Sequence, residues 1–294
     1  MQNTIKEHYV PQFYLRNFAD ENGLLHIYDF KQNKFFMQKP KNICYESNLY
    51  ETKWENANPK LGKFVLQNHI EKIFCKYEGE FSKVLIKILQ KCIPSQNQNA
   101  LILYEKERDI FFHFIVNIVV RNPQNMKSLA IDKLEVNDIC DEDINQIYSL
   151  LDEIGLGGGD SLCLAAKKKA ILTDEFENSF TKICLGALKK LNYTFFYAKN
   201  DSLITSDIPV CVGDDPMIVE DDKTSIYFAL SPKVAVIFGN YKCSHDFKNR
   251  MVCIEEKQVE NFNRILIKHS DNKRILIANS NATLRKHVEG VRKE

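Results

Sequence analysis

The sequence predicts an α+β protein with a predominantly helical middle and a mixed or antiparallel sheet built from the C-terminal third and an N-terminal hairpin. Three observations lead to this fold class. Between residues 62 and 191, apolar side chains recur every three or four positions, which is the spacing of helices with one buried face. From residue 192 onward, aromatic and β-branched runs are bounded by turn residues, as strands are. Residues 24–38 have the composition of a hairpin.

The N-terminal elements are expected first. Val10-Pro11 opens a short helix, because proline fits the first helical turn. Strands are then expected over residues 24–30 and 34–38, joined across Lys31-Gln32-Asn33 as a β-hairpin that carries aromatic side chains.

The helical middle contains two strong segments. Residues 62–91 predict one long helix or two in series, ended by Pro94. A second helix is expected from about residue 100 to Arg121, because the residue before Pro123 avoids the helical basin. Further helices are expected over 129–154 and 174–191, with a flexible glycine-rich connection at 155–161 and a solvated basic patch at 167–169.

The last third supplies most of the sheet. Strands are expected over 193–198, 226–230, 234–238, 251–254 and 274–278, with a helix over 259–269. No internal repeat or low-complexity tract interrupts the chain. We therefore expect a single domain over residues 1–283, with a helical middle at about 62–191, a sheet-rich part at about 192–283 and a removable basic tail at 284–294.

Composition limits the classes of function. The 40 Lys and Arg residues nearly balance the 39 Asp and Glu residues, so a net charge of +1 offers no global attraction for nucleic acid or anionic membrane. The nine cysteines contain no CxxC pair, which favours free thiols in a reducing compartment over disulfides or a zinc site. No signal-like segment and no run of about 18 apolar residues is present, so a cytoplasmic protein without a membrane span is expected.

The segment HYVPQFYLRNF, residues 8–18, combines polar and core-forming side chains. Gln12 and Arg16 are four residues apart and share one helix face. Together with His8 before the helix, they could bind a phosphate or carboxylate. The alternative is that Gln12 and Arg16 only tie this helix to the sheet.

A second polar pattern is His113, Asn117 and Arg121, spaced i, i+4, i+8 on an otherwise apolar helix. A buried arginine needs an anionic partner, because an unpaired buried charge costs several kcal/mol. Arg121 is therefore a candidate ligand clamp. The alternative is a structural ion pair with a carboxylate from another helix.

In LITSDIPV, residues 203–210, a short apolar strand presents Ser206 and Asp207 before Pro209. Asp207 could be a general base, a metal ligand or an arginine partner, and Ser206 could bind phosphate. Ser and Asp before proline are also ordinary turn formers. Glu71 and Glu78, seven residues apart on one helix face, are weak candidates for a divalent metal, and a solvated face or an arginine partner is the usual role of such a pair.

The opening motif, TSDxPV at 205–210 and LSPK at 230–233 resemble a bacterial family known as domain of unknown function 4238. The resemblance spans nearly the whole chain, and Arg121-x-Pro123 and the Glu71/Glu78 helix are similar to less specific family features. It implies one family-length domain that groups the opening motif with Ser206 and Asp207. It implies no particular reaction.

Two functions remain open. The first is an enzyme that acts on a phosphodiester or nucleotide, such as a nuclease-type effector of a bacterial defence or toxin system. In it, His8 and Asp207 are the catalytic candidates, Arg16, Arg121 and Ser206 would bind phosphate, and Gln12 and Asn17 would orient it. The second is a non-catalytic module that binds an anion or a partner protein. The sequence leaves open the reaction, the substrate, the use of a divalent metal and the oligomeric state.

Overall fold

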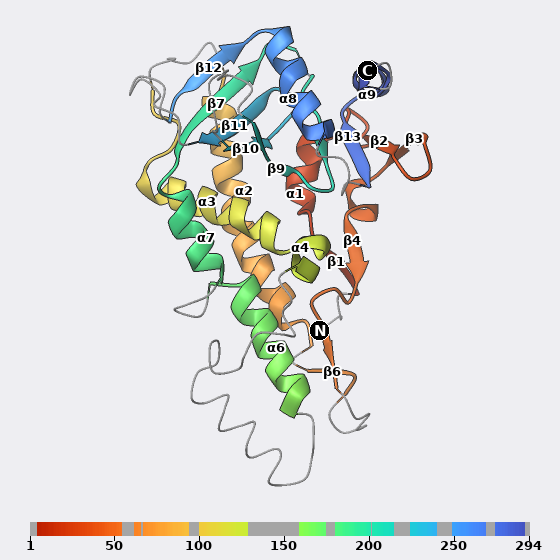
Figure 1. The fold of residues 1–294 in the computed structure, drawn as a ribbon, viewed down its shortest axis with the longest axis vertical. Helices are drawn as coiled ribbons and strands as arrows, with labels where there is room; N and C mark the ends of the chain where they lie inside the picture. The colour runs from red at the N-terminus through yellow and green to blue at the C-terminus, as the bar shows by residue number, and fades with distance from the viewer. Residues whose placement is uncertain are drawn as a thin grey trace.

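The computed structural model describes most of the chain and has an α+β fold (Figure 1). The described residues are 5–54, 62–65, 67–93, 100–128, 159–174, 180–200, 202–214, 224–239, 249–268 and 274–291. The helix expected over 129–154 lies outside them.

A five-stranded mixed sheet forms the upper part of the molecule (Figure 1). Its order is β12-β7-β11-β10-β9, in which β12 runs parallel to β7 and the other neighbours are antiparallel. All five strands come from the C-terminal third, and four of them match predicted strands, whereas β9 was not predicted and the predicted strand 274–278 lies in another sheet. The bounds are β7 Asn192–Ala198, β9 Val210–Asp214, β10 Thr224–Ala229, β11 Val234–Gly239 and β12 Met251–Ile254.

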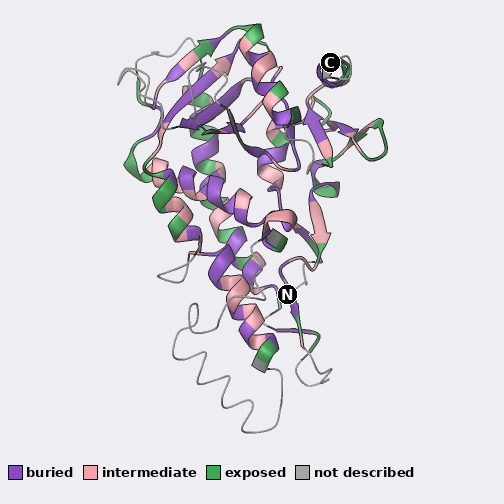
Figure 2. Cartoon of the chain, viewed as in Figure 1, coloured by how far each residue is buried: buried purple, intermediate pink, exposed green. Residues whose placement is uncertain are grey.

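Two helices, α3 (Glu105–Val120) and α8 (Glu256–Lys268), cover opposite faces of this sheet. Successive strand residues point to opposite faces, so Phe195 of β7 packs on Phe111 of α3 and the next residue, Phe196, packs on Phe262 of α8. Because both faces are covered, β11 is buried at every position, and Figure 2 shows the strand interior as buried. This explains its uninterrupted apolar sequence.

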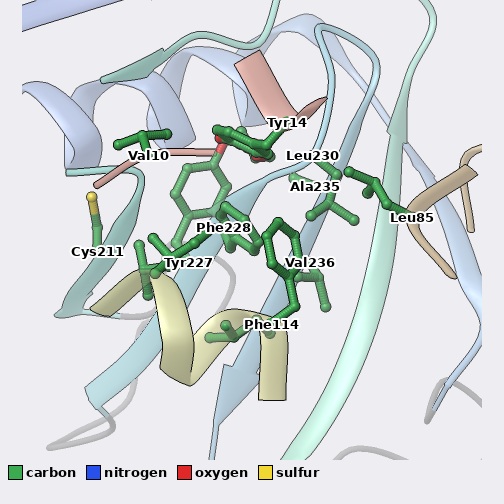
Figure 3. Packing of buried hydrophobic residues seen from close by; sticks show 14 of the residues in the cluster. Val10, Tyr14, Leu85, Phe114, Cys211, Tyr227, Phe228, Leu230, Ala235 and Val236 are labelled. Atoms are coloured by element: carbon green, nitrogen blue, oxygen red, sulfur yellow. The ribbon is translucent and has the colours of Figure 1, made fainter. Parts of the chain in front are cut away.

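The opening motif is anchored in the core of the protein through Tyr14. After β1 (Lys6–His8), the chain forms a four-residue helix, α1 (Gln12–Leu15), and the 3₁₀ turn η1 (Arg16–Phe18). The Tyr14 hydroxyl donates to the carbonyl of Ala229 and lies 2.7 Å from the Thr205 hydroxyl, while its ring stacks on Phe228 (Figure 3). The opening motif therefore meets the 205–210 motif through a buried hydroxyl contact and packs on β10 just before the 230–233 motif.

The N-terminal hairpin belongs to a second, antiparallel sheet of order β3-β2-β13-β8. Its strands are β2 Leu25–Asp29, β3 Lys34–Gln38, β8 Thr205–Ser206 and β13 Ile275–Ala278. The predicted hairpin is confirmed, and it pairs with the closing strand of the chain. A helix follows, α9 (Asn281–Val291), in which Leu284 and Val288 are buried. Residues 284–291 therefore form part of a packed helix where the sequence predicts a basic tail.

The helical part lies below the five-stranded sheet (Figure 1). The helix predicted over 62–91 is wrong at its start, because Phe64 and Val65 form a short strand and the helix begins at His69. Helix α6 begins at Gly159, inside the glycine-rich connection that was predicted to be flexible. The remaining bounds are η2 Pro40–Asn42, β4 Tyr45–Ser47, β5 Thr52–Lys53, β6 Phe64–Val65, α2 His69–Lys91, α4 Pro123–Ser128, α6 Gly159–Leu172 and α7 Phe180–Leu188.

The cysteines and the helix lengths bear on the expectations drawn from composition. The described cysteines are all free thiols, although Cys75 and Cys253 are exposed rather than buried. Within these same ranges, no helix combines the length and apolar character needed to cross a lipid bilayer.

Candidate functional site

The Arg121 side chain is buried at the junction of β1, α2 and α3, and only 1% of it is exposed. Nη1 donates to Glu78 Oε1 at 2.8 Å and to Asn117 Oδ1 at 3.2 Å, and Nε donates to the Tyr50 hydroxyl at 3.1 Å. Nη2 donates to the backbone carbonyl of His8. We call Arg121, Glu78, Asn117 and Tyr50 the Arg121 cluster.

This geometry confirms the structural alternative for Arg121. Its partner is Glu78, a carboxylate from α2, and each guanidinium nitrogen already has an acceptor. Burial alone would lower the pKa of Arg121, but Tyr50 and Glu78 raise it above its ordinary value. The guanidinium is also 4.4 Å from the centre of the Phe74 ring. Four of its five N–H donors have acceptors in these contacts, and one of them is the His8 carbonyl, so Arg121 fixes the end of β1.

His8 lies at the edge of this cluster and is half-buried. Burial lowers the pKa of its imidazole below 6.5, while an interaction with the backbone of Lys41 acts in the opposite direction. Nε2 is buried and has no hydrogen-bond partner among the described residues. We therefore assign the Lys41 interaction to Nδ1, which leaves Nε2 with a free lone pair on a neutral ring.

The outer side of His8 carries exposed cations and an aromatic ring. The His8 ring centre is 5.5 Å from that of Tyr45, and Lys6 Nζ lies 4.6 Å from the Tyr45 ring. Helix α1 contacts η2, which carries the exposed Lys41. Arg16 follows α1 and is exposed.

The side chains of Gln12 and Arg16 form no hydrogen bond or ion pair within the described ranges, so the alternative that they tie the helix to the sheet finds no support. Helix α1, with four residues, is too short to provide the expected anion site at its N-terminus.

Asp207 is buried, 3% exposed, and its carboxylate holds the start of β13. It accepts hydrogen bonds from the backbone N–H groups of Arg274, at 3.1 and 3.2 Å, and of Ile275, at 3.3 Å. Burial raises the pKa of Asp207 despite these bonds. In the described part of the chain, no hydrogen bond or ion pair joins Asp207 to Arg16 or Arg121, so these two arginines are not its partners in this structure.

Ser206 forms a closed turn. Its Oγ donates to the carbonyl of Ile208 at 2.8 Å and accepts from the N–H of Ile208 at 3.1 Å. The residue is fully buried. Ser206 has the turn-forming role that the sequence left open, and it offers nothing to a phosphate in this arrangement.

Two asparagines connect the motifs through backbone groups. Asn17 Nδ2 donates to the carbonyl of Leu230 at 3.3 Å, and Asn122 Nδ2 donates to the carbonyl of Asp207 at 3.2 Å. Asn122 directly follows Arg121, whose guanidinium binds the His8 carbonyl. The 205–210 segment therefore lies next to the C-terminal end of α3. The separated motifs converge, but they do so through structural hydrogen bonds.

The weak metal candidates are also accounted for. Glu78 is the partner of Arg121. Burial raises the pKa of Glu71, and the charge of Arg121 offsets part of this rise. In the part of the chain that the structure describes, no group of three or more His, Cys, Asp or Glu side chains could hold a metal ion.

Glu7 and Lys168, which no sequence motif marked as candidates, complete the site. Glu7 is fully buried beside His8, and its Oε2 accepts from the N–H of Tyr50 at 2.8 Å. Lys168, from the basic patch expected to be solvated, is half-buried and donates to the carbonyl of Glu51 at 2.7 Å. Nothing in the local pattern around Glu7 signals burial, because Lys6, Glu7 and His8 form a polar run.

Comparison with known proteins gives a family. A family described as "Protein of unknown function (DUF4238)" matches residues 6–282 of the 294-residue chain. This chain is a DUF4238 protein. The match confirms the resemblance carried by the opening motif. No curated protein and no solved structure matches this DUF4238 protein.

Proposed function

We propose that this DUF4238 protein is an enzyme that acts on a phosphodiester or nucleotide, with His8 as its general base. One observation carries the proposal: His8 Nε2 has no hydrogen-bond partner among the described residues, and burial lowers the pKa of this imidazole, which favours its neutral form. A general base needs this state, because it must accept a proton in the transition state. Since Nε2 is buried, we expect the proton to move through one bridging water.

The surroundings of His8 support the substrate class. Lys6, Lys41 and Arg16 are exposed cations on segments that adjoin His8, and they would attract a phosphate group. Tyr45 offers a ring against which a base could stack. The phosphate would therefore bind on this outer face, since Arg121 and Asp207 have their own partners.

A second candidate function is a non-catalytic module that binds an anion or a partner protein on the same outer face. The hydrogen bonds of Arg121, Asp207 and Ser206 favour it, because each of these buried side chains already binds a structural partner. In this case the exposed cations bind and nothing turns over.

Substitution of His8 distinguishes the enzyme from the non-catalytic binding module. The purified protein is incubated with end-labelled single-stranded RNA, single-stranded DNA, duplex DNA and free nucleoside triphosphates, and products are resolved by chromatography. We expect cleavage of one probe and a loss of about 10²- to 10⁴-fold in His8→Ala. His26→Ala is the control, because His26 pairs with Asp20 in the second sheet, and it should retain activity.

The pH profile provides a further check on the cleaved probe. Because burial lowers the pKa of His8, the midpoint of the acid-side fall in kcat/KM should lie below pH 6.5. If the protein binds a probe but cleaves none of them, the result favours the non-catalytic binding module. Full activity in folded His8→Ala contradicts the enzyme proposal. If expression of the wild type is toxic to a bacterial host and expression of His8→Ala is not, the result would support a role as a defence or toxin effector.

A further inference from the structure

The second sheet ends in a strand whose outer edge has no partner among the described residues. β3 is the last strand in the order β3-β2-β13-β8, and Figure 1 shows it at the outer margin of the molecule, on the side of β2 away from β13. Its side chains are only partly covered: Met37 is 51% exposed, and Phe35 and Phe36 are half-buried. The proposed function does not use this edge.

The register shows which backbone groups of β3 point outward. Phe30, directly after β2, donates its N–H to the carbonyl of Arg274 at 3.0 Å, so its backbone groups face β13. Because these groups alternate along a strand, those of the last residue of β2 face β3, where the partner is Lys34. By the same alternation, Phe35 and Met37 direct their N–H and C=O groups away from β2. Within the described ranges, no hydrogen bond to these outward groups is found.

Exposed cations border this edge on a stretch of chain without acidic residues. The segment KQNKFFMQKPK, residues 31–41, contains four lysines and no Asp or Glu. Lys31, Lys34 and Lys39 are exposed, and none of the three forms an ion pair in the described part of the chain. Arg285 of α9 adds a guanidinium 4.6 Å from the centre of an aromatic ring of β3. The edge therefore combines open backbone groups with an excess of positive charge.

We propose that β3 binds an extended, acidic segment of a partner protein, which adds to the second sheet as a further strand. The open N–H and C=O groups of an edge strand can pair with an extended chain. Lys34 and Lys39 lie at the two ends of β3, where they would contact carboxylates of this chain. Met37 would pack against apolar side chains between them. Acidic residues five positions apart, a span of about 17 Å in a strand, would match the two lysines.

The charges of the edge disfavour a second copy of the chain as the occupant. Two β3 strands side by side would bring the lysines of both copies together, and like charges on adjacent strands are destabilising. On β2, Asp29 lies opposite Lys34, but its Oδ1 already accepts the N–H of Gln32 in the hairpin turn. Lysines on edge strands commonly prevent pairing of identical chains. The same lysines would favour an acidic partner.

Fluorescence anisotropy with the full chain tests the proposal. The probe is a labelled hexapeptide with glutamate at both ends and alternating valine and threonine between them, and the control peptide has lysine at both ends. The glutamate peptide should bind about tenfold tighter than the lysine peptide at low salt. N-methylation of alternate peptide residues should abolish binding in one phase and preserve it in the other, because only every second N–H of an added strand faces β3.

Variants of the chain locate the binding site. Met37→Pro removes an outward N–H and no hydrogen bond to β2, so it should fold and bind the glutamate peptide about tenfold more weakly. Met37→Ala is the matched control, because it removes the same side chain, keeps the N–H and should retain most of the binding. Lys34→Glu with Lys39→Glu should reverse the preference between the two peptides. Lys76→Glu with Lys83→Glu makes the same change of charge at exposed positions of α2 and should preserve the preference.

Equal binding of the two peptides, no binding of either, or N-methylation effects without alternation would overturn the proposal. The N-methylated peptides use the wild type, so the test stands even if Met37→Pro fails to fold. Dimerisation of the wild type that Met37→Pro abolishes would assign the edge to a second copy instead. Binding of single-stranded RNA through the same lysines, without binding of either peptide, would assign it to nucleic acid. No measurement here involves His8 or turnover, so failure is distinct from failure of the enzyme proposal.

Discussion

Replacement of Glu78 by alanine lowers the free energy of unfolding by about 3 kcal/mol. Glu78 is the carboxylate that contacts the guanidinium of Arg121, and Arg121 is 1% exposed. Without it, a buried charge loses its ion-pair partner, and only the charge of Glu71 remains nearby. The measurement is urea unfolding followed by circular dichroism, with the free energy extrapolated to water.

Glu80→Ala is the control for this result, because Glu80 is exposed on the same helix and the substitution is identical. It should change stability by less than about 0.5 kcal/mol. The double variant Glu78→Ala with Arg121→Met should recover part of the loss, because it removes the buried charge together with its partner. Equal stability of Glu78→Ala and Glu80→Ala would refute the structural role of the Arg121 cluster.

Asp207→Ala is expected to lower the free energy of unfolding by about 2–4 kcal/mol. Its buried carboxylate accepts backbone N–H groups at the start of β13, and these partly buried donors lose their acceptor in the variant. The pairing of β13 with β8 and β2 then loses its fixed end. Chemical unfolding of the purified variant measures the loss.

Two comparisons sharpen this second prediction. Asp207→Asn should lose less, because its carbonyl oxygen can still accept one of the N–H groups. Asp109→Ala removes a carboxylate that is 43% exposed and pairs with Lys189 at the surface, so it should cost less than about 1 kcal/mol. If folded Asp207→Ala is as stable as the wild type, the structural role of Asp207 is contradicted and its catalytic role becomes the hypothesis to test.

Much of the fold was predictable because its elements have strong local patterns. The strands β7, β11 and β12 are uninterrupted aromatic or β-branched runs, and α8 has a regular apolar face, so their positions follow from periodicity. The pattern fails where an apolar pair is too short to show a period. Phe64 and Val65 fit a helix as well as a strand, and only their pairing with β5 makes them a strand.

The candidate site was predictable in part. Helical spacing correctly marked Asn117 and Arg121 as neighbours, and a buried arginine had to have a partner. The choice of Glu78 rather than Asp207 as that partner depends on how α2 packs against α3, which no local pattern contains. Glu7 escaped detection for the same reason, since its hydrogen-bond partner Tyr50 is distant in sequence.

The most direct test is the protonation state of His8 itself. Nitrogen-15 spectra of histidine-labelled protein, assigned with His8→Gln, report which ring nitrogen carries the proton and at what pH the ring titrates. We predict a neutral ring with the proton on Nδ1, a bare Nε2 and a pKa below 6.5. A proton on Nε2 at neutral pH, or a pKa above 6.5, would contradict the assignment of His8 as general base.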